Sequence, residues 1–105
     1  VGSHAPTLRE LDTASIQKAK VITDQTQACL LEAGDIMIPI QEGDYSADKI
    51  HGELGAVITG TTTGRENEEE LTLFKSVGLA IQDLSCARLV YDLAVENGVG
   101  TEFDF

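Results

Sequence analysis

Apolar residues recur along the chain in two patterns, one at helical spacing and one in short runs typical of strands. Asp12 is placed to cap a short helix over 13–19, with Ile16 on its inner side. Val21 and Ile22 then form a short apolar run. The start of the chain therefore predicts a loop, a helix and a strand.

A second helix is predicted directly after this strand. Asp24 ends the apolar run, and its spacing from Gln27 resembles a capping box. Leu31 continues the helical spacing, and Gly34 is predicted to be the C′ residue, just past the C-cap of the helix.

Residues 35–40 carry two conflicting signals. Isoleucines at 36, 38 and 40 alternate as in a strand. Pro39 lacks the N–H group of a sheet ladder, which restricts it to an edge strand or to no strand. The pattern leaves this segment open.

A third helical stripe follows in the middle of the chain. It runs from Ile50 to Ile58, with Ser46 as a possible N-cap and Gly60 at its end. Residues 60–70 are polar and acidic, which predicts an exposed loop.

The last third predicts a strand over 71–76, punctuated by Gly78. A long helix follows to about Asn97, and residues 101–105 allow a terminal strand. Strands that alternate with helices imply right-handed crossovers and a parallel sheet. A complete doubly wound domain has about six strands, and only about half of these fit here. The predicted fold class is α/β, a partial Rossmann-like parallel sheet with flanking helices.

Charge excludes two classes of partner. The 105 residues contain 18 acidic and 7 basic side chains, which gives a formal net charge of −11. This acidity disfavours nucleic acids and anionic membrane surfaces. No apolar run reaches the roughly 20 residues of a membrane helix. Cys29 and Cys86 lie in apolar helical patterns, which predicts two reduced, buried thiols and a cytoplasmic protein.

The common phosphate-binding and metal-binding motifs are absent. Gly98 and Gly100 follow a helix rather than open one, and Gly60–Gly64 lacks the Lys-Ser/Thr pair of a P-loop. His51 and Glu53 are two residues apart and would lie on different helix faces, so no metal site is predicted.

Two places are more suggestive of chemistry. His4 precedes a proline turn, and a histidine at the carboxyl end of a strand is a plausible acid, base or anion partner. Ser76 lies where a strand enters a helix, at the sheet edge where α/β proteins bind ligands. Its hydroxyl can bond a cofactor amide, or it can belong to an ordinary helix cap.

The same two places resemble a known family. Residues 1–12 read VGSHAPTLRELD and are similar to the VGxDxPGKxELD segment of the ornithine cyclodeaminase/mu-crystallin family. Residues 73–84, LFKSVGLAIQDL, resemble a second motif of that family, and 32–35 and 52–55 agree in order and spacing. The resemblance implies an NAD(P)-dependent, usually dimeric protein, of which this chain would form the C-terminal third.

The resemblance also implies roles for single residues. A loop would line the nicotinamide, a hydroxyl would contact the cofactor, and one apolar side chain would touch the substrate. These positions are Val1, Gly2, Ser3 and His4 for the loop, Ser76 for the cofactor contact and Val77 for the substrate contact. His4 stands where cyclodeaminases have the catalytic Asp, and Leu8 stands where they have a cofactor-binding Lys. These departures favour the branch that reduces cyclic imines or dehydrogenates amino acids.

Three functions follow from this resemblance. The first is an NAD(P)-dependent oxidoreductase acting at the Cα–N bond of an amino or cyclic imino acid, with His4 as catalytic proton donor and a homodimeric assembly. The second is conversion of ornithine to proline and ammonia, and the third is a non-catalytic mu-crystallin-like binding protein. The resemblance divides the chain into 1–78, the second half of the NAD(P)-binding domain, and 79–105, a return helix and terminal strand. We expect this chain alone to fold and to be inactive.

Overall fold

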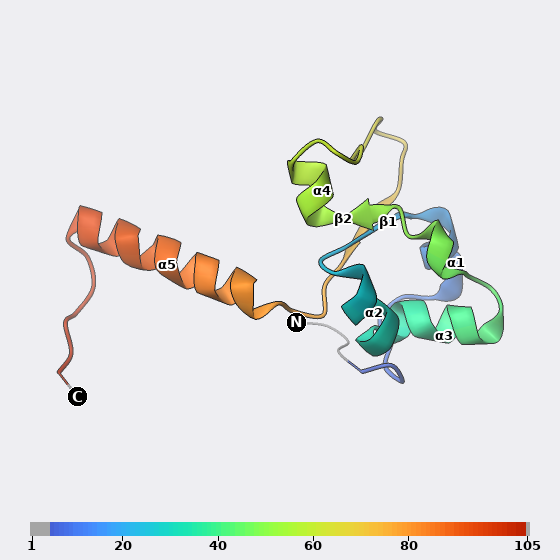
Figure 1. Ribbon diagram of the computed structural model, residues 1–105, viewed down its shortest axis with the longest axis horizontal. Coiled ribbons are helices and arrows are strands. Elements are labelled where there is room, and N and C mark those ends of the chain that lie inside the picture. Colours follow the sequence, from blue (N-terminus) through green and yellow to red (C-terminus); the bar gives the residue numbers. More distant parts are fainter. Residues whose placement is uncertain (1–4, 105) are drawn as a thin grey trace.

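Three short parallel strands form the sheet of the protein (Figure 1). The computed structural model describes residues 5–104. The strands are β1 (Lys20–Thr23), β2 (Gly52–Glu53) and β3 (Thr72–Lys75), in the order β2-β1-β3. β1 pairs in parallel with both neighbours. The predicted parallel α/β class is confirmed.

Helices connect the strands and extend the chain beyond the sheet (Figure 1). They are α1 (Thr13–Lys18), α2 (Thr26–Glu32), α3 (Gly34–Glu42), the 3-10 helix η1 (Ala47–Lys49), α4 (Leu54–Ile58) and α5 (Ala80–Asn97). α1 agrees with the prediction, because the Asp12 carboxylate accepts a hydrogen bond of 2.7 Å from the Ser15 amide and Ile16 is fully buried.

The core lies between one face of the sheet and the first three α-helices. Its buried apolar side chains come from β1, these helices and the turn after α3: Ile16, Val21, Cys29, Ala33, Ile36 and Tyr45. The opposite face is covered only in part. There Ile22, Phe74 and Val57 line a shallow apolar hollow of about 180 Å³. Phe74 remains 48% exposed, so this face is incompletely packed.

Residues 35–40, which the pattern left open, are helical. Ile36 and Pro39 are buried on one side of α3, so the isoleucine alternation is part of a helical face. α2 ends at Glu32 with Ala33 as its C-cap residue, so Gly34 stands at the predicted position just past the cap, and it also begins α3. The backbone explains the glycine: a Cβ atom at position 34 would lie 1.9 Å from the Leu8 carbonyl oxygen.

The single helix predicted between Ser46 and Gly60 is also corrected. The chain forms η1, then β2, then α4. The amide of His51 donates a hydrogen bond of 2.9 Å to the Val21 carbonyl, so the backbone here extends the sheet beside β1. Ser46 makes no side-chain cap. The apolar residues between Ile50 and Ile58 are therefore spaced as in one helix, although this stretch contains the short strand β2.

Residues 60–70 form the predicted loop, which is largely exposed. Two of its carboxylates nevertheless bind the sheet, since Lys20 Nζ lies 2.7 Å from Glu66 and 2.6 Å from Glu70. The acidic run therefore packs its ends against β1 instead of being solvated throughout.

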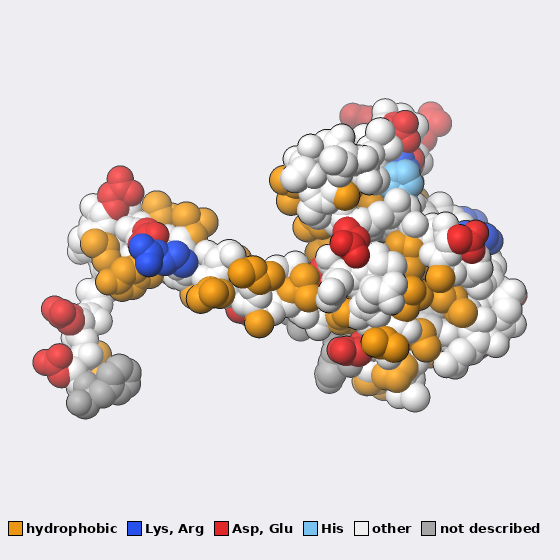
Figure 2. Space-filling view, in the orientation of Figure 1, with side chains coloured by type: hydrophobic (Ala, Val, Ile, Leu, Met, Phe, Trp, Pro, Cys, Tyr) orange, Lys and Arg blue, Asp and Glu red, His pale blue; other side chains and the backbone are white. Residues whose placement is uncertain are grey.

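The long helix α5 has the predicted bounds and extends away from the sheet (Figure 1). None of its residues is buried, and apolar side chains lie along it in the space-filling view (Figure 2). Cys86 lies here and is exposed, so its predicted burial is wrong, whereas Cys29 is buried as expected. Residues 101–104 form no strand, which corrects the predicted terminal strand within the described part. Between residues 5 and 104, no helix has the length and apolar character needed to cross a membrane.

Candidate functional site

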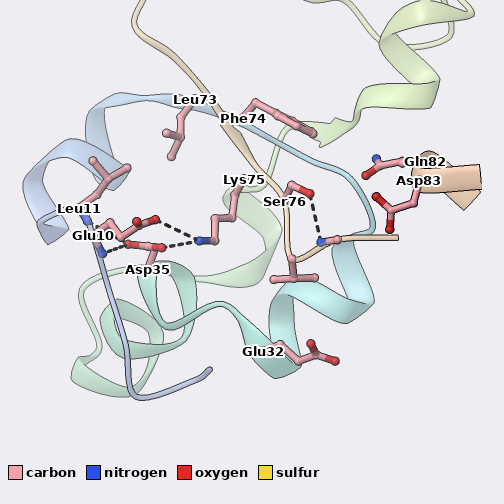
Figure 3. Close-up of a pocket in the computed structure, with 12 residues that line it drawn as sticks. Glu10, Leu11, Glu32, Asp35, Leu73, Phe74, Lys75, Ser76, Gln82 and Asp83 are labelled. Atoms are coloured by element: carbon pink, nitrogen blue, oxygen red, sulfur yellow. Dashed lines mark hydrogen bonds and ion pairs between the residues drawn. The ribbon is translucent and has the colours of Figure 1, made fainter. Parts of the chain in front are cut away.

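The carboxyl ends of β1 and β3 open into a cleft of about 890 Å³ (Figure 3). Thr23 pairs with Lys75 at these strand ends, so the residues that follow them lie side by side. Asp24 follows β1, and Ser76 follows β3. Parallel α/β sheets bind their ligands at this edge, which makes the cleft the candidate functional site.

The carboxylate of Asp24 holds the turn that follows β3. Its Oδ2 atom accepts hydrogen bonds from Ser76 Oγ at 2.6 Å, from the Val77 amide at 3.0 Å and from the Gly78 amide at 3.0 Å. Gly78 has a φ of 93°, a left-handed conformation that glycine adopts without strain. One buried oxygen therefore fixes three consecutive residues at the cleft.

The second oxygen of Asp24 accepts hydrogen bonds from the start of α2. Oδ1 accepts from the Gln25 amide at 2.7 Å and from Cys29 Sγ at 3.3 Å. Burial raises the pKa of Asp24, but the hydrogen bonds from Ser76 and the other donors outweigh it and leave the pKa below its usual 3.8. Asp24 is therefore ionised at neutral pH. The predicted capping box is wrong, because Gln25 is the N-cap of α2 and makes no side-chain cap bond.

A buried ion pair supports the other side of the cleft. Lys75 Nζ lies 2.7 Å from Asp35 Oδ2, with the two side chains 8% and 1% exposed. In Figure 3 the Lys75 side chain points toward Asp35 and Glu10. The other Asp35 oxygen accepts hydrogen bonds from the amides of Glu10 at 2.6 Å and Leu11 at 2.9 Å. Asp35 thus connects β3 to the segment that follows residues 1–4.

The ion pair with Lys75 keeps the Asp35 carboxyl ionised. Burial raises the pKa of its carboxyl, but the hydrogen bond with Lys75 and the two backbone amides overcome that effect and lower the pKa below 3.8. Asp35 therefore carries its negative charge at neutral pH, where it neutralises the Lys75 ammonium.

The cleft is acidic. Four carboxylates and one ammonium group line it: Glu10, Glu32, Asp35, Asp83 and Lys75. Because Lys75 is bound to Asp35, the remaining field favours positively charged ligand groups and disfavours phosphates.

The predicted site residues fall into two groups. Ser76 and Val77 both line the cleft and lie side by side on the turn held by Asp24. Val1, Gly2, Ser3 and His4 lie outside the described residues. Ser76 is not a helix cap, because Leu79 is the N-cap residue of α5.

Sequence reasoning missed Asp24 and Asp35 as site residues. The sequence does contain a signal for Asp24, because an acidic residue directly after an apolar strand lies at the ligand-binding edge of a parallel sheet. Asp35 carries none, since its partners are 24, 25 and 40 residues away along the chain.

His51, which the sequence also offers, lies apart from the cleft. His51 is exposed, and its Nε2 atom lies 2.8 Å from the Thr63 carbonyl oxygen. Within residues 5–104, no three His, Cys, Asp or Glu side chains gather closely enough to hold a metal ion.

The family can be decided by comparison with known proteins. The sequence model of the ornithine cyclodeaminase/mu-crystallin family matches residues 1–98. The chain belongs to this family. The match includes both segments on which the resemblance rests, the one that contains His4 and the one that contains Ser76.

Individual members with high similarity are reductases and dehydrogenases. The chain is 48% identical over 106 aligned residues to a Δ1-pyrroline-2-carboxylate reductase of Bacillus cereus, covering all of this chain and 33% of the relative. The structure of the Thermococcus litoralis Δ1-pyrroline-2-carboxylate reductase in complex with NADH and L-proline gives a TM-score of 0.81 at 47% identity, over 93% of this chain and 30% of that one. An archaeal alanine dehydrogenase dimer with bound NAD gives a TM-score of 0.77 at 35% identity, over 98% and 32%.

The chain thus spans about a third of the length of these relatives. Its three-stranded parallel sheet and flanking helices match part of proteins that bind NAD or NADH.

Proposed function

We propose that the complete gene product is an NAD(P)-dependent oxidoreductase that acts at the Cα–N bond of a cyclic imino acid, as a Δ1-pyrroline-2-carboxylate reductase. The observation that carries the proposal is the position of Ser76 and Val77, on a fixed turn at the ligand-binding edge of a parallel sheet. The 47% identity to a reductase solved with NADH and L-proline supports this choice of substrate class.

The residues present fit the nicotinamide end of the cofactor. The turn offers a half-buried hydroxyl at Ser76, and beside it a Cβ atom on Gly78 would meet no atom within 4 Å, so a flat ring has room. The acidic lining suits a cationic ring but not a pyrophosphate, and the chain has no glycine fingerprint. When bound, the nicotinamide supplies the hydride.

The chain's own residues would position the reactants and supply a proton. Ser76 would hold the carboxamide of the cofactor, and Val77 would contact the substrate. The acidic cleft stabilises a protonated imine nitrogen, which is the electrophilic form that a hydride attacks. His4 is the proposed proton donor, because histidine is the side chain best suited to general acid-base catalysis near neutral pH.

We propose that residues 1–78 complete an NAD(P)-binding domain and that 79–105 pack on the rest of the protein, since α5 buries none of its residues here. We also propose a homodimer, supported by the dimeric alanine dehydrogenase relative, and a cytoplasmic location, for which the two free thiols argue.

The test is reduction of Δ1-pyrroline-2-carboxylate by the complete gene product with NADH or NADPH. We expect proline as the product, and a kcat about a hundredfold or more lower for His4→Ala. His51→Ala is the matched control, because His51 lies outside the cleft, and it should leave kcat unchanged.

Three outcomes would contradict the proposal. Proline and ammonia formed from ornithine, without net oxidation of the cofactor, would indicate a cyclodeaminase. Cofactor binding without turnover of any imino or amino acid would indicate a binding protein. An unchanged kcat in His4→Ala would remove His4 from the mechanism.

A further inference from the structure

Ser76 donates its hydroxyl hydrogen to the carboxylate of Asp24. Ser76 Oγ lies 2.6 Å from Asp24 Oδ2, and the ionised carboxylate only accepts hydrogen bonds. The hydrogen of this bond therefore belongs to Ser76. A serine hydroxyl has a single hydrogen, so Ser76 has none left to donate to a ligand.

The hydroxyl oxygen of Ser76 accepts one hydrogen bond and has room for a second. The Gly78 amide lies 3.2 Å from Ser76 Oγ and donates to it. A hydroxyl oxygen accepts two hydrogen bonds. One acceptor position therefore remains, on a side chain that lines the cleft.

Asp24 is held so that it cannot release this arrangement by rotating. It is 8% exposed, and its other oxygen accepts from the Gln25 amide and Cys29 Sγ. Oδ2 is also held by the backbone amides of Val77 and Gly78. All five partners donate, so no alternative orientation of the carboxylate reverses the Ser76 bond.

We propose that Asp24 is a positioning residue that makes Ser76 an obligate hydrogen-bond acceptor, so that the site selects a cofactor that presents an N–H donor. This inference rests on the proposed function, in which the ligand group at Ser76 is the nicotinamide carboxamide. The carboxamide presents an NH₂ group, which Ser76 accepts. A pyridine ring with an acetyl group in its place presents only a carbonyl oxygen, which Ser76 cannot satisfy.

The experiment compares the affinities of two dinucleotides for the complete gene product by calorimetric titration, without turnover. The probes are NAD or NADP, whichever binds, and its 3-acetylpyridine analogue. One net hydrogen bond corresponds to an affinity ratio of about five to ten. We expect the wild type to favour the nicotinamide form by that ratio. Because the measured quantity is a ratio, a general loss of affinity through altered folding does not change it.

Variants at position 76 test the acceptor. Ser76→Ala removes the hydroxyl, and we expect its ratio to fall to about one, whereas Ser76→Thr retains the hydroxyl and should retain the ratio. Ser46→Ala is the control: that hydroxyl also donates to a carboxylate, of Asp48, but lies outside the cleft. Its ratio should equal that of the wild type.

Variants at position 24 test the positioning role. Asp24→Ala frees the Ser76 hydrogen to donate to the carbonyl of either probe, and the ratio should fall toward one. In Asp24→Asn, an NH₂ group turned toward Ser76 would oppose two backbone N–H donors, of Val77 and Gly78. Turned the other way it would oppose one, of Gln25, beside the Cys29 sulfur, which can accept weakly. The amide oxygen should therefore stay toward Ser76, and the ratio should persist. If Asp24→Ala does not fold, Asp24→Asn decides, and loss of its ratio would overturn the role of Asp24.

The failures are distinguishable. Absence of any dinucleotide binding would overturn the proposed function together with this inference. Dinucleotide binding with equal affinity for both probes, or with a ratio that survives in Ser76→Ala, would overturn this inference alone.

Discussion

Lys75 Nζ lies 2.7 Å from the Asp35 carboxylate, and both side chains are withdrawn from solvent. The pair joins the end of β3 to the first turn of α3. Through its second oxygen, Asp35 also holds the backbone at Glu10 and Leu11. Through Asp35, the segment that follows His4 is therefore tied to Lys75, the residue directly before Ser76.

Breaking this pair should destabilise the protein strongly. Lys75→Met leaves the Asp35 charge buried without its ammonium partner. Asp35→Asn removes the nearest carboxylate from the Lys75 ammonium, which also lies 3.9 Å from Glu10. Removal of one partner of a buried pair costs about 3–5 kcal/mol. Urea denaturation of the complete gene product measures the change in the free energy of unfolding.

The exposed pair between Arg88 and Asp92, four residues apart on α5, is the matched control. Arg88→Met should change the free energy of unfolding by no more than about 0.5 kcal/mol. Equal changes in the free energy of unfolding for Lys75→Met and Arg88→Met would contradict the expected cost of breaking the buried pair.

The two buried carboxylates should make the stability sensitive to acid. Asp24 and Asp35 both have pKa values below the usual 3.8, so each binds protons more weakly when folded than when unfolded. Their contribution to stability is complete above about pH 5 and is lost as the pH falls through the folded pKa values. Urea denaturation between neutral pH and pH 3 should show this decline. A smaller decline is expected in Asp35→Asn, and a decline of the same size there would contradict the assignment.

The sequence predicted those elements whose signals are local. Asp12 caps α1 through the amide of Ser15, three residues on, and β3 lies within the strand-like run 71–76, which Gly78 punctuates. α3 escaped prediction because Ile36, Ile38 and Ile40 satisfy period 2 as well as part of a helical face, and Pro39 argues against either structure. β2 escaped because its two residues are set by pairing with β1, which no local pattern reports.

The candidate site likewise contains residues with local sequence signals and residues whose role depends on long-range contacts. The strand-to-helix position of Ser76 predicts a residue at the ligand-binding edge from the sequence alone. The dependence of that residue on Asp24 joins positions 52 residues apart and arises only when β1 and β3 become neighbours. The expected burial of Cys86 failed for a related reason, since apolar spacing indicates a helix face but not what covers it.

Cys29 should be unreactive in the folded protein. Burial, followed by the hydrogen bond to the Asp24 carboxylate, raises the pKa of its thiol to about 12. The thiolate is the reactive form, and it is scarcely populated at neutral pH. Alkylation followed by peptide mass analysis should find Cys29 unmodified until denaturant is added. The Cys86→Ser variant isolates this signal, and rapid native modification of Cys29 there would contradict the prediction.

Gly34→Ala should destabilise the protein because its Cβ atom would lie 1.9 Å from the Leu8 carbonyl oxygen. Overpacking of this kind costs about 1–3 kcal/mol. Gly55→Ala is the control: Gly55 is also helical, in α4, and its Cβ would meet no atom within 4 Å. There the higher helix propensity of alanine should stabilise by up to about 1 kcal/mol. Thermal unfolding of both variants measures the contrast, and equal shifts would contradict the close approach of Leu8.

The last prediction concerns this 105-residue chain produced alone, which should self-associate through α5 and bind dinucleotides poorly. Seven large apolar side chains of α5 are 47–65% exposed: Ile81, Leu84, Leu89, Val90, Tyr91, Leu93 and Val95. A lone helix of this length has marginal stability, and contiguous apolar surface favours association. One hydrogen bond at Ser76 contributes about 1 kcal/mol, far below the roughly 8 kcal/mol of micromolar affinity.

Light scattering over a range of concentrations should show a dimer or larger assembly. Replacing Leu84 and Val95 with Lys should shift it toward the monomer, because charges on α5 oppose burial of the helix. Ile58→Lys is the control, since Ile58 is 76% exposed but lies on α4. That variant should associate as the original chain does. A strict monomer at high concentration would contradict the association, and micromolar dinucleotide binding by this chain would contradict its expected inactivity, because Ser76 and Val77 would then not need partners from elsewhere in the protein.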